Sequence, residues 1–211
     1  MVQVLKDSVR DKITQAAESE FAEVGFKSAT VEAIARKAGV ATGTVYKYFP
    51  NKKALFQSII TDDFVEELAH LTRSRIASFA KPDGLDAGQN PMEGESGDLL
   101  RFFVHNRLKV VILLGWGKGT KYEDFVPNYI HEMELQTMNQ AQEQFPQLKR
   151  TQVFRFMVRK SLTESIRGIV SILQEFTDEK SIHAAFTASV GYQLAGINAL
   201  VNWALSAEQP S

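Results

Sequence analysis

Apolar residues recur at helical spacing along most of the chain, and this spacing limits what the chain can fold into. Between Val9 and Val24 they stand three or four positions apart, which places them on one face of a helix. Two long segments near the end of the chain, about 151–176 and 179–205, show the same spacing. Because no segment alternates apolar and polar residues as a half-buried strand does, we predict an all-α fold.

The first fifty residues predict three helices with marked ends. Gly25 ends the first, since glycine readily takes the left-handed conformation that stops a helix. Thr30 caps a second, short helix that Gly39 ends, and Pro50 stops a third short helix. Two short helices joined by a tight turn and braced by a preceding helix form a helix-turn-helix unit, here at residues 30–49.

We assign residues 1–51 to this helix-turn-helix domain and residues 52–211 to a second helical domain. Asn51 can cap a long helix at about 52–79. The stretch 81–97 is dense in Gly, Pro, Asp and Asn and predicts a mobile loop. Further helices are predicted at about 98–114, 123–144, 151–176 and 179–205.

The composition excludes several kinds of site. No cysteine occurs among the 211 residues, so the chain has no disulfide, no cysteine-ligated metal and no thiol nucleophile. The four histidines lack metal-ligand spacing, and the glycine-rich segment 115–120 fails the phosphate-loop pattern. We therefore expect no catalytic residue, metal or cofactor. The longest strongly apolar stretch, 110–116, is too short to span a bilayer, so we expect a soluble cytoplasmic protein with no membrane partner.

The charge is unevenly distributed along the chain, although the whole chain has a net charge of −1. Residues 1–60 contain 9 Lys+Arg and 6 Asp+Glu, a net charge of +3, and residues 61–211 contain 15 and 19, a net charge of −4. Together with the helix-turn-helix unit, this basic surplus favours binding of DNA by the first domain.

The second helix of such a unit enters the DNA major groove, so its outward residues should reach base edges or phosphates. The residues that fit are Thr42, Gly43, Thr44, Tyr46, Lys47 and Tyr48. Lys52 and Lys53 stand in the first turn of the next helix, where the helix dipole disfavours a cation. A DNA phosphate would compensate, and the alternative is that both lysines are merely solvated.

Three segments carry a resemblance to a known family. TVEAIARKAGV at 30–40, TGTVYKYF at 42–49 and NKKALF at 51–56 together resemble the TetR/AcrR family of transcriptional regulators. The resemblance implies an all-helical homodimer whose N-terminal domains bind a palindromic double-stranded DNA operator and whose C-terminal domain binds a small molecule. It also implies DNA roles for single residues: backbone contacts for Thr30, Thr44, Tyr46 and Tyr48, contacts nearer the bases for Thr42, Gly43 and Lys47, and a phosphate contact for Lys52.

Two positions depart from the family pattern. Ala41 stands where the family usually has a Ser or Thr that caps the recognition helix. Thr42 can take over this cap, and then its contact to a base is in question. Lys53 stands where the family tends to have Glu, which adds positive charge where DNA would lie.

The last two predicted helices are apolar or small on two sides, which indicates two packing partners for each. We predict that one side forms a four-helix interface with a second copy of the chain. A core buried within one subunit is the alternative. The predicted dimer residues are Phe154, Met157, Ser161, Ser165, Ile172, Ala185, Ala188, Tyr192, Ala195, Ala199 and Trp203.

The middle helices contain aromatic and flexible apolar residues from which a ligand pocket can be built. Taken singly, each of these residues is better explained as part of the core than as a ligand contact. The predicted pocket residues are Phe102, Phe103, His105, Trp116, Tyr122, Phe125, Tyr129, Met133 and Glu164.

The sequence thus predicts a ligand-responsive transcriptional regulator, most simply a repressor that a small apolar or amphipathic molecule releases from its operator. The mechanism expected is a tilt of the helix at 52–79, which changes the spacing of about 34 Å between the two recognition helices. The alternatives are a DNA-binding regulator controlled by a protein partner, an architectural DNA binder and, remotely, an enzyme.

Overall fold

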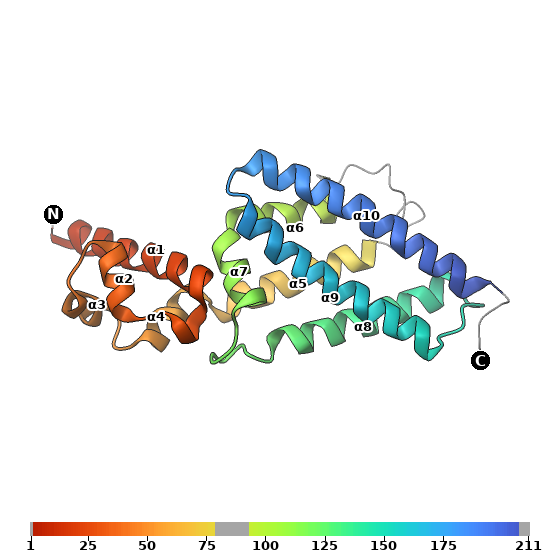
Figure 1. Ribbon diagram of the computed structural model, residues 1–211, viewed down its shortest axis with the longest axis horizontal. Helices are drawn as coiled ribbons and strands as arrows, with labels where there is room; N and C mark the ends of the chain where they lie inside the picture. The colour runs from red at the N-terminus through yellow and green to blue at the C-terminus, as the bar shows by residue number, and fades with distance from the viewer. Residues whose placement is uncertain (1, 79–92, 207–211) are drawn as a thin grey trace. The chain divides into compact units, whose positions relative to one another are not determined.

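The computed structural model describes residues 2–78 and 93–206, with side chains from Ser8 onward, and every regular element in these ranges is a helix (Figure 1). The all-α prediction is confirmed. The helices are α1 (Val2–Ser28), α2 (Val31–Ala38), α3 (Thr42–Tyr48), α4 (Lys52–Ile59), α5 (Asp62–Ser78), α6 (Gly94–His105), α7 (Arg107–Gly115), α8 (Phe125–Gln144), α9 (Gln152–Glu175) and α10 (Glu179–Leu205).

The chain forms two compact units whose boundaries differ from the predicted domains. The first unit contains the chain up to Val65 together with Asn106–Val126, and the second contains Glu66–His105 together with the chain from Pro127 onward. The first unit therefore includes α4 and α7, because α7 packs against α1. The helix α5 begins in the first unit and continues into the second.

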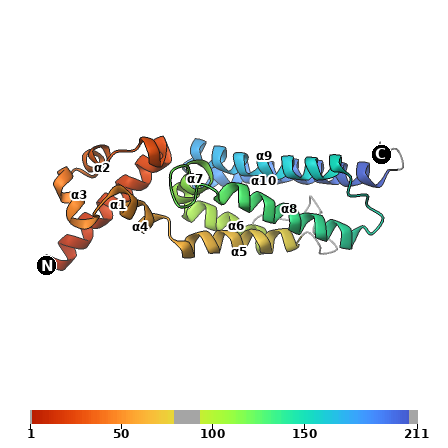
Figure 2. The same ribbon diagram turned by 90° about the horizontal axis from the view of Figure 1, so that it is seen from below.

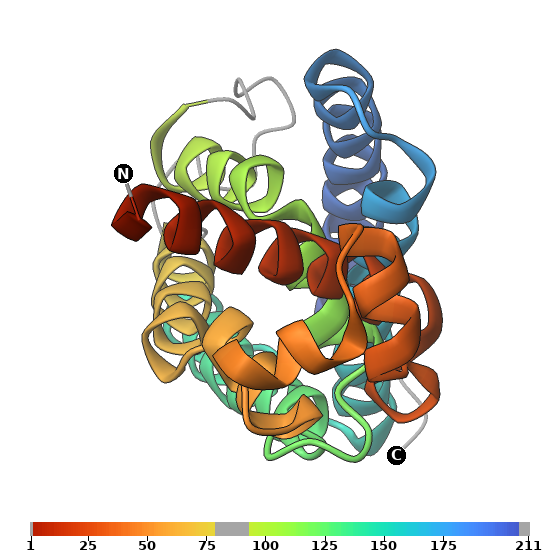
Figure 3. The same ribbon diagram turned by 90° about the vertical axis from the view of Figure 1, so that its left-hand side faces the viewer.

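In the first unit α1 packs against α2, α4 and α7 (Figure 3). The helix starts earlier than predicted, but its regular part ends where expected, because Gly25 has a φ of 77° and kinks it. A side chain at this position would also collide with Trp116, whose Cε3 lies 2.9 Å from an ideal Cβ.

The caps predicted for the next helices are confirmed. The Thr30 hydroxyl accepts a hydrogen bond from the backbone N–H of Ala33, and the Asn51 side chain accepts one from that of Ala54. Gly39 ends α2 with a φ of 68°. Since these ends depend on neighbouring residues only, the sequence suffices to locate α2 and the start of α4.

An aromatic cluster at the centre of the first unit joins α1 to α4. The ring centroid of Phe56 lies 5.5 Å from that of Phe21 and 5.1 Å from that of Phe26. Above the Phe26 ring, at 4.6 Å from its centroid, lies the ammonium group of Lys52. Its Nζ donates to the carbonyl oxygens of Phe26 at 2.6 Å, Ala29 at 2.7 Å and Lys27 at 3.4 Å. This side chain therefore closes the carbonyl end of α1.

The prediction of one continuous helix at 52–79 is wrong. It breaks at Ile60 and Thr61 into α4 and α5, and the Thr61 hydroxyl accepts from the N–H of Phe64 at the start of α5. Phe79 lies outside the described residues.

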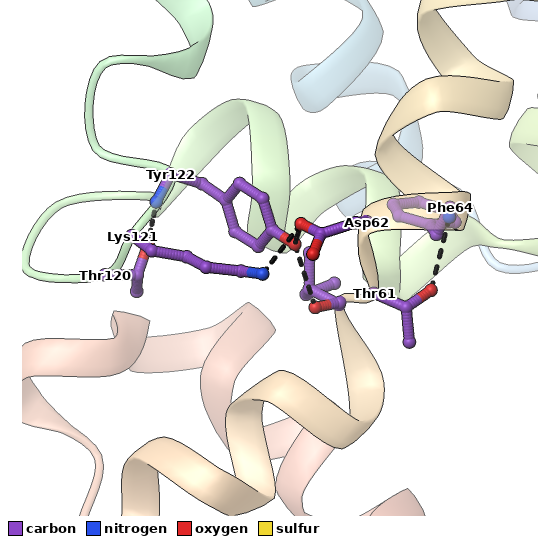
Figure 4. A network of polar contacts seen from close by, with 7 residues as sticks. Thr61, Asp62, Phe64, Thr120, Lys121 and Tyr122 are labelled. Carbon is purple, nitrogen blue, oxygen red and sulfur yellow. Dashed lines mark hydrogen bonds and ion pairs between the residues drawn. The ribbon is translucent and has the colours of Figure 1, made fainter.

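The segment after α7 holds this break in place (Figure 4). The Tyr122 hydroxyl donates to an Asp62 carboxylate oxygen at 2.8 Å, and Lys121 Nζ lies 2.7 Å from the same oxygen. The hydrogen bonds from Lys121 and Tyr122 lower the pKa of Asp62 below its ordinary value. The start of α5 is thereby fixed to the loop that precedes α8.

The second unit is a bundle in which α9 and α10 run side by side (Figure 2). The Phe103 and Phe186 rings stack at 5.4 Å between α6 and α10. The prediction for 81–97 is partly wrong, because residues 94–97 belong to α6, while 81–92 lie outside the described residues. The helix predicted at 98–114 is divided at Asn106 into α6 and α7.

We predict that Gly25→Ala destabilises the protein by about 2 kcal/mol, because the left-handed conformation is costly for alanine and its Cβ meets Trp116. Gly43→Ala is the matched control. Gly43 is a helical glycine with open space around it, and its replacement by alanine should raise the free energy of unfolding by as much as about 1 kcal/mol. Urea denaturation of the two variants measures both effects, and equal midpoints would contradict the prediction.

We predict that Lys52→Met lowers the free energy of unfolding by about 1–3 kcal/mol, because carbonyl groups at the end of α1 lose a charged donor. Lys53→Met removes the same charge from the exposed neighbouring position and should change stability by less than about 0.5 kcal/mol. Thermal or urea unfolding distinguishes the two. If both variants unfold alike, the bonds of Lys52 contribute nothing.

Candidate nucleic-acid interface and internal cavities

The helix α3 is held to the first unit by one face and presents the other outward. Val45 and Phe49 are buried, at 1% and 4% exposure, as predicted. The Tyr46 side chain is 50% exposed, and Gly43 and Lys47 are also exposed. The outward face therefore combines a phenol, an ammonium group and open backbone, which together can donate hydrogen bonds to phosphates and base edges.

The residues around α3 complete this surface. Thr42, Thr44 and Tyr48 are partly exposed, and Thr30 and Lys53 are exposed. The guanidinium of Arg10 lies 5.5 Å from the centroid of the Phe49 ring, which fixes the end of α3 against α1.

Two sequence-based interpretations of this surface are corrected. Ala41 itself occupies the N-cap position of α3 without a side-chain hydrogen bond, and Thr42 is the first helical residue, so Thr42 does not take over the cap. Lys52 does not need a phosphate to offset the helix dipole. Its ammonium already bonds carbonyl oxygens at the end of α1, and burial lowers its pKa.

Two of the cavities in the described part of the second unit adjoin each other. The larger, of about 190 Å³, lies among α5, α6, α8, α9 and α10, and the smaller, of about 120 Å³, continues between the far ends of α8, α9 and α10. The two share the lining residues Ile76, Ser161, Leu162 and Ile197. The bundle core is therefore hollow along part of its length, which suits an elongated apolar ligand.

Three of the predicted pocket residues line the larger cavity, namely Phe103, Tyr129 and Met133. The other six lie elsewhere. Phe102 is buried outside both linings, and His105 and Glu164 are exposed, with Glu164 paired to Arg167 at 3.1 Å. Trp116, Tyr122 and Phe125 belong to the first unit.

The polar residues of the cavity are ones that the sequence did not single out. Thr72 and Arg75 line it from α5, and Gln193 lines it from α10. A signal for Thr72 was present, since Thr72 stands four residues after Leu68 and four before Ile76, on the inner stripe of its helix. Ser161 and Ser165, predicted at the dimer interface, also line this cavity, because these two positions of α9 face inward.

Another predicted dimer residue, Phe154, is 2% exposed and packs in a core with Met138, Leu148 and Val158. Phe154 is therefore unavailable to a partner.

The predicted dimer residues of α10 lie mostly at the surface. Tyr192 is 83% exposed and Trp203 37%, with Ala188, Ala195 and Ala199 also exposed and Ala185 partly so. On α9, Met157 is exposed, as is the neighbouring Phe156, and Ile172 is partly exposed.

One buried charge stabilises the second unit. The Glu134 side chain is completely buried, and its carboxylate accepts from the Nε of Arg155 at 2.5 Å and of Arg159 at 2.6 Å. Burial alone would raise its pKa, but the hydrogen bonds from Arg159 and Arg155 outweigh burial and lower it. This triad joins α8 to α9 beside the cavities.

Residues 13–59 match the family described as "Bacterial regulatory proteins, tetR family". The regulator UidR of Escherichia coli (strain K12) is 42% identical over 60 residues, which cover 28% of this chain and 31% of UidR. The repressor KstR2 of Mycolicibacterium smegmatis is 36% identical over 108 residues, covering 50% of this chain and 48% of KstR2. The match thus spans about a third of UidR and about half of KstR2.

Among solved structures, the fatty acid degradation regulator FadR from Bacillus halodurans covers 89% of this chain and 95% of its own, with 22% identity and a TM-score of 0.46. The matched residues 13–59 include α2, α3 and α4, which form the surface described above. The relatives named here are transcriptional regulators and not enzymes, in agreement with the expectation from the sequence. Residues 13–59 thus form a domain of the kind found in the TetR family of bacterial transcriptional regulators.

Proposed function

We propose that this protein is a dimeric, cytoplasmic repressor that leaves a palindromic operator when a small amphipathic molecule enters the cavities of its second unit. The observation that carries the proposal is the outward face of α3, with Gly43, exposed Tyr46 and exposed Lys47, within the segment that matches the family. An exposed basic and phenolic helix face on a buried apolar anchor is what insertion into a major groove requires.

The roles proposed for single residues follow their exposure. Gly43 and Lys47 lie nearest the bases, with Thr42, which is not needed as a cap. Tyr46 and Lys53 contact phosphates. Thr30, Thr44 and Tyr48 also contact the DNA backbone; the Thr30 hydroxyl can do so while it caps α2, because a hydroxyl accepts and donates at once.

The cavities favour control by a small molecule over constitutive architectural binding. A purely structural DNA binder gains nothing from a hollow core, since empty space forfeits packing energy. The helix α5 lines the larger cavity with Thr72, Arg75 and Ile76, and its first residue, Asp62, is held by Tyr122 in the first unit. We propose that a ligand displaces α5 and so changes the spacing of the recognition helices, which makes DNA and ligand mutually exclusive.

The proposed dimer uses the outward face of α10, where Ala188, Tyr192, Ala195, Ala199 and Trp203 succeed one another every three or four residues. The most apolar window of α10 has a mean hydropathy of 1.2, yet only 11% of it is buried. Length and hydropathy alone would also suit a membrane span. The small residues between Tyr192 and Trp203 permit close approach of another helix, which favours a second copy of this chain.

The first experiment is titration of the purified protein with the DNA that flanks its own coding region and with a scrambled duplex. We expect Lys53→Gln to weaken binding and to reduce the slope of log K against log salt by about 1, because one phosphate contact is lost. Lys180→Gln, the same charge change on α10, should leave the slope unaltered. Absence of binding at low salt would refute the regulator assignment.

We expect Tyr192→Glu to raise the dissociation constant of the dimer at least about tenfold, because the interface would bury an unpaired carboxylate. Leu135→Glu places the same charge at a 46% exposed position of α8 and should leave the dimer intact. Analytical ultracentrifugation over a range of protein concentrations measures both. A monomeric native protein would contradict the proposed interface.

A further inference from the structure

The charge distribution inside the cavities narrows the class of ligand. Among the described residues that line these two cavities, Arg75 is the one charged side chain. The rest are apolar or neutral, including Thr72, Ser161, Ser165 and Gln193. A guanidinium among neutral and apolar lining residues favours a ligand that has one carboxylate, because it can form charge-assisted hydrogen bonds to that group.

The surroundings of Arg75 indicate how it could receive such a charge. Its side chain is largely buried, and burial lowers its pKa, while the Glu95 carboxylate favours its charged form. One terminal nitrogen, Nη1, donates to the Ser78 hydroxyl at 3.0 Å. A guanidinium has five N–H donors in a planar fork that matches a carboxylate, so it can bond a ligand while it keeps these neighbours.

A hydroxyl on the same helix adds a second donor. The Tyr129 hydroxyl donates to the Thr72 hydroxyl oxygen, and both residues line the larger cavity. Burial raises the pKa of Tyr129, which stays protonated and keeps this role. Because Thr72 accepts from Tyr129, its own proton remains to be donated to a ligand oxygen. Thr72 and Arg75 are three residues apart and so lie on neighbouring positions of one helix face.

The apolar part of the ligand has its own space. Arg75 adjoins Ile76, which lines both cavities, and beyond Ile76 the smaller cavity is lined by residues such as Phe145, Val158 and Leu200. These residues come from α8, α9 and α10. A chain or ring system placed there would bury its apolar surface without leaving a charge unpaired.

We propose that the effector is an apolar monocarboxylic acid, with its carboxylate at Arg75 and Thr72 and its apolar body in the smaller cavity. This inference rests on the proposed function, since it names the ligand class of the same cavity. It differs from a neutral lipid or alcohol of the same size by one charged hydrogen-bonding group, which makes the class testable.

The test measures binding of decanoate and of decan-1-ol to the full-length protein by calorimetry. We expect decanoate to bind at least tenfold more tightly than the alcohol. Arg75→Gln should weaken decanoate binding about 10- to 100-fold and leave the alcohol unaffected, because it removes a charge-assisted hydrogen bond. Arg75→Lys, which keeps the charge, should recover part of the loss and guards against a mere folding defect.

Two further variants sharpen the test. Glu95→Gln removes the carboxylate that favours the charge of Arg75 from nearby, and it should tighten decanoate binding several-fold. Arg167→Gln removes an exposed charge of α9 that lies outside these cavities and is paired with Glu164 at 3.1 Å, and it should have no effect. If Arg75→Gln and Arg167→Gln behave alike, or if the alcohol binds as tightly as decanoate, the proposal is overturned.

Operator binding by the same proteins without ligand separates this inference from the proposed function. Loss of preference for the native DNA would refute the regulator. Tight operator binding that decanoate and decan-1-ol release equally would leave the regulator intact and overturn the carboxylate. Failure of decanoate to bind a protein that binds its operator would likewise overturn the carboxylate alone.

Discussion

Three carbonyl oxygens near the end of α1 accept hydrogen bonds from a single ammonium group, that of Lys52 at the start of α4. The same ammonium lies over the Phe26 ring, which packs against Phe56 of α4. The contacts join the two ends of the segment that contains α2 and α3, so the recognition helix is held between two fixed points. Gly25, with a φ of 77°, interrupts the regular helix just before these carbonyl groups.

The core of the second unit is not fully packed. Its helices leave adjoining cavities at their centre, and polar side chains such as Thr72, Arg75 and Ser161 face them. Such residues weaken a core, because buried polar groups must find hydrogen-bond partners. The Glu134 triad supplies rigidity beside the cavities, with its carboxylate held by Arg155 and Arg159. A hollow bundle whose lining includes polar side chains is less stable than a filled one, but it fits the proposed binding of a ligand.

Much of the candidate DNA surface could be predicted from the sequence, and little of the cavity. Thr30, Gly39 and Asn51 act on backbone groups within three or four residues, so their roles follow from local rules. The carbonyl groups that bind Lys52 lie more than twenty residues away along the chain. Helix-dipole reasoning correctly indicated that the Lys52 ammonium needs a compensating acceptor, but it named a DNA phosphate, whereas the structure has backbone carbonyl oxygens. Ser161 and Ser165 were assigned to a dimer because small size fits both an interface and a cavity wall.

The sequence by itself determined the helical class, the ends of the short helices, the buried anchors Val45 and Phe49 and the family of the first unit. These depend on periodicity and on contacts close along the chain. The tertiary structure decided which apolar residues line a cavity, that Trp116 and Tyr122 belong with the first unit, and that Arg75 lines a cavity of the second. A helix with apolar residues on two sides packs equally well in either direction, so its neighbours can be identified only once all helices are in place.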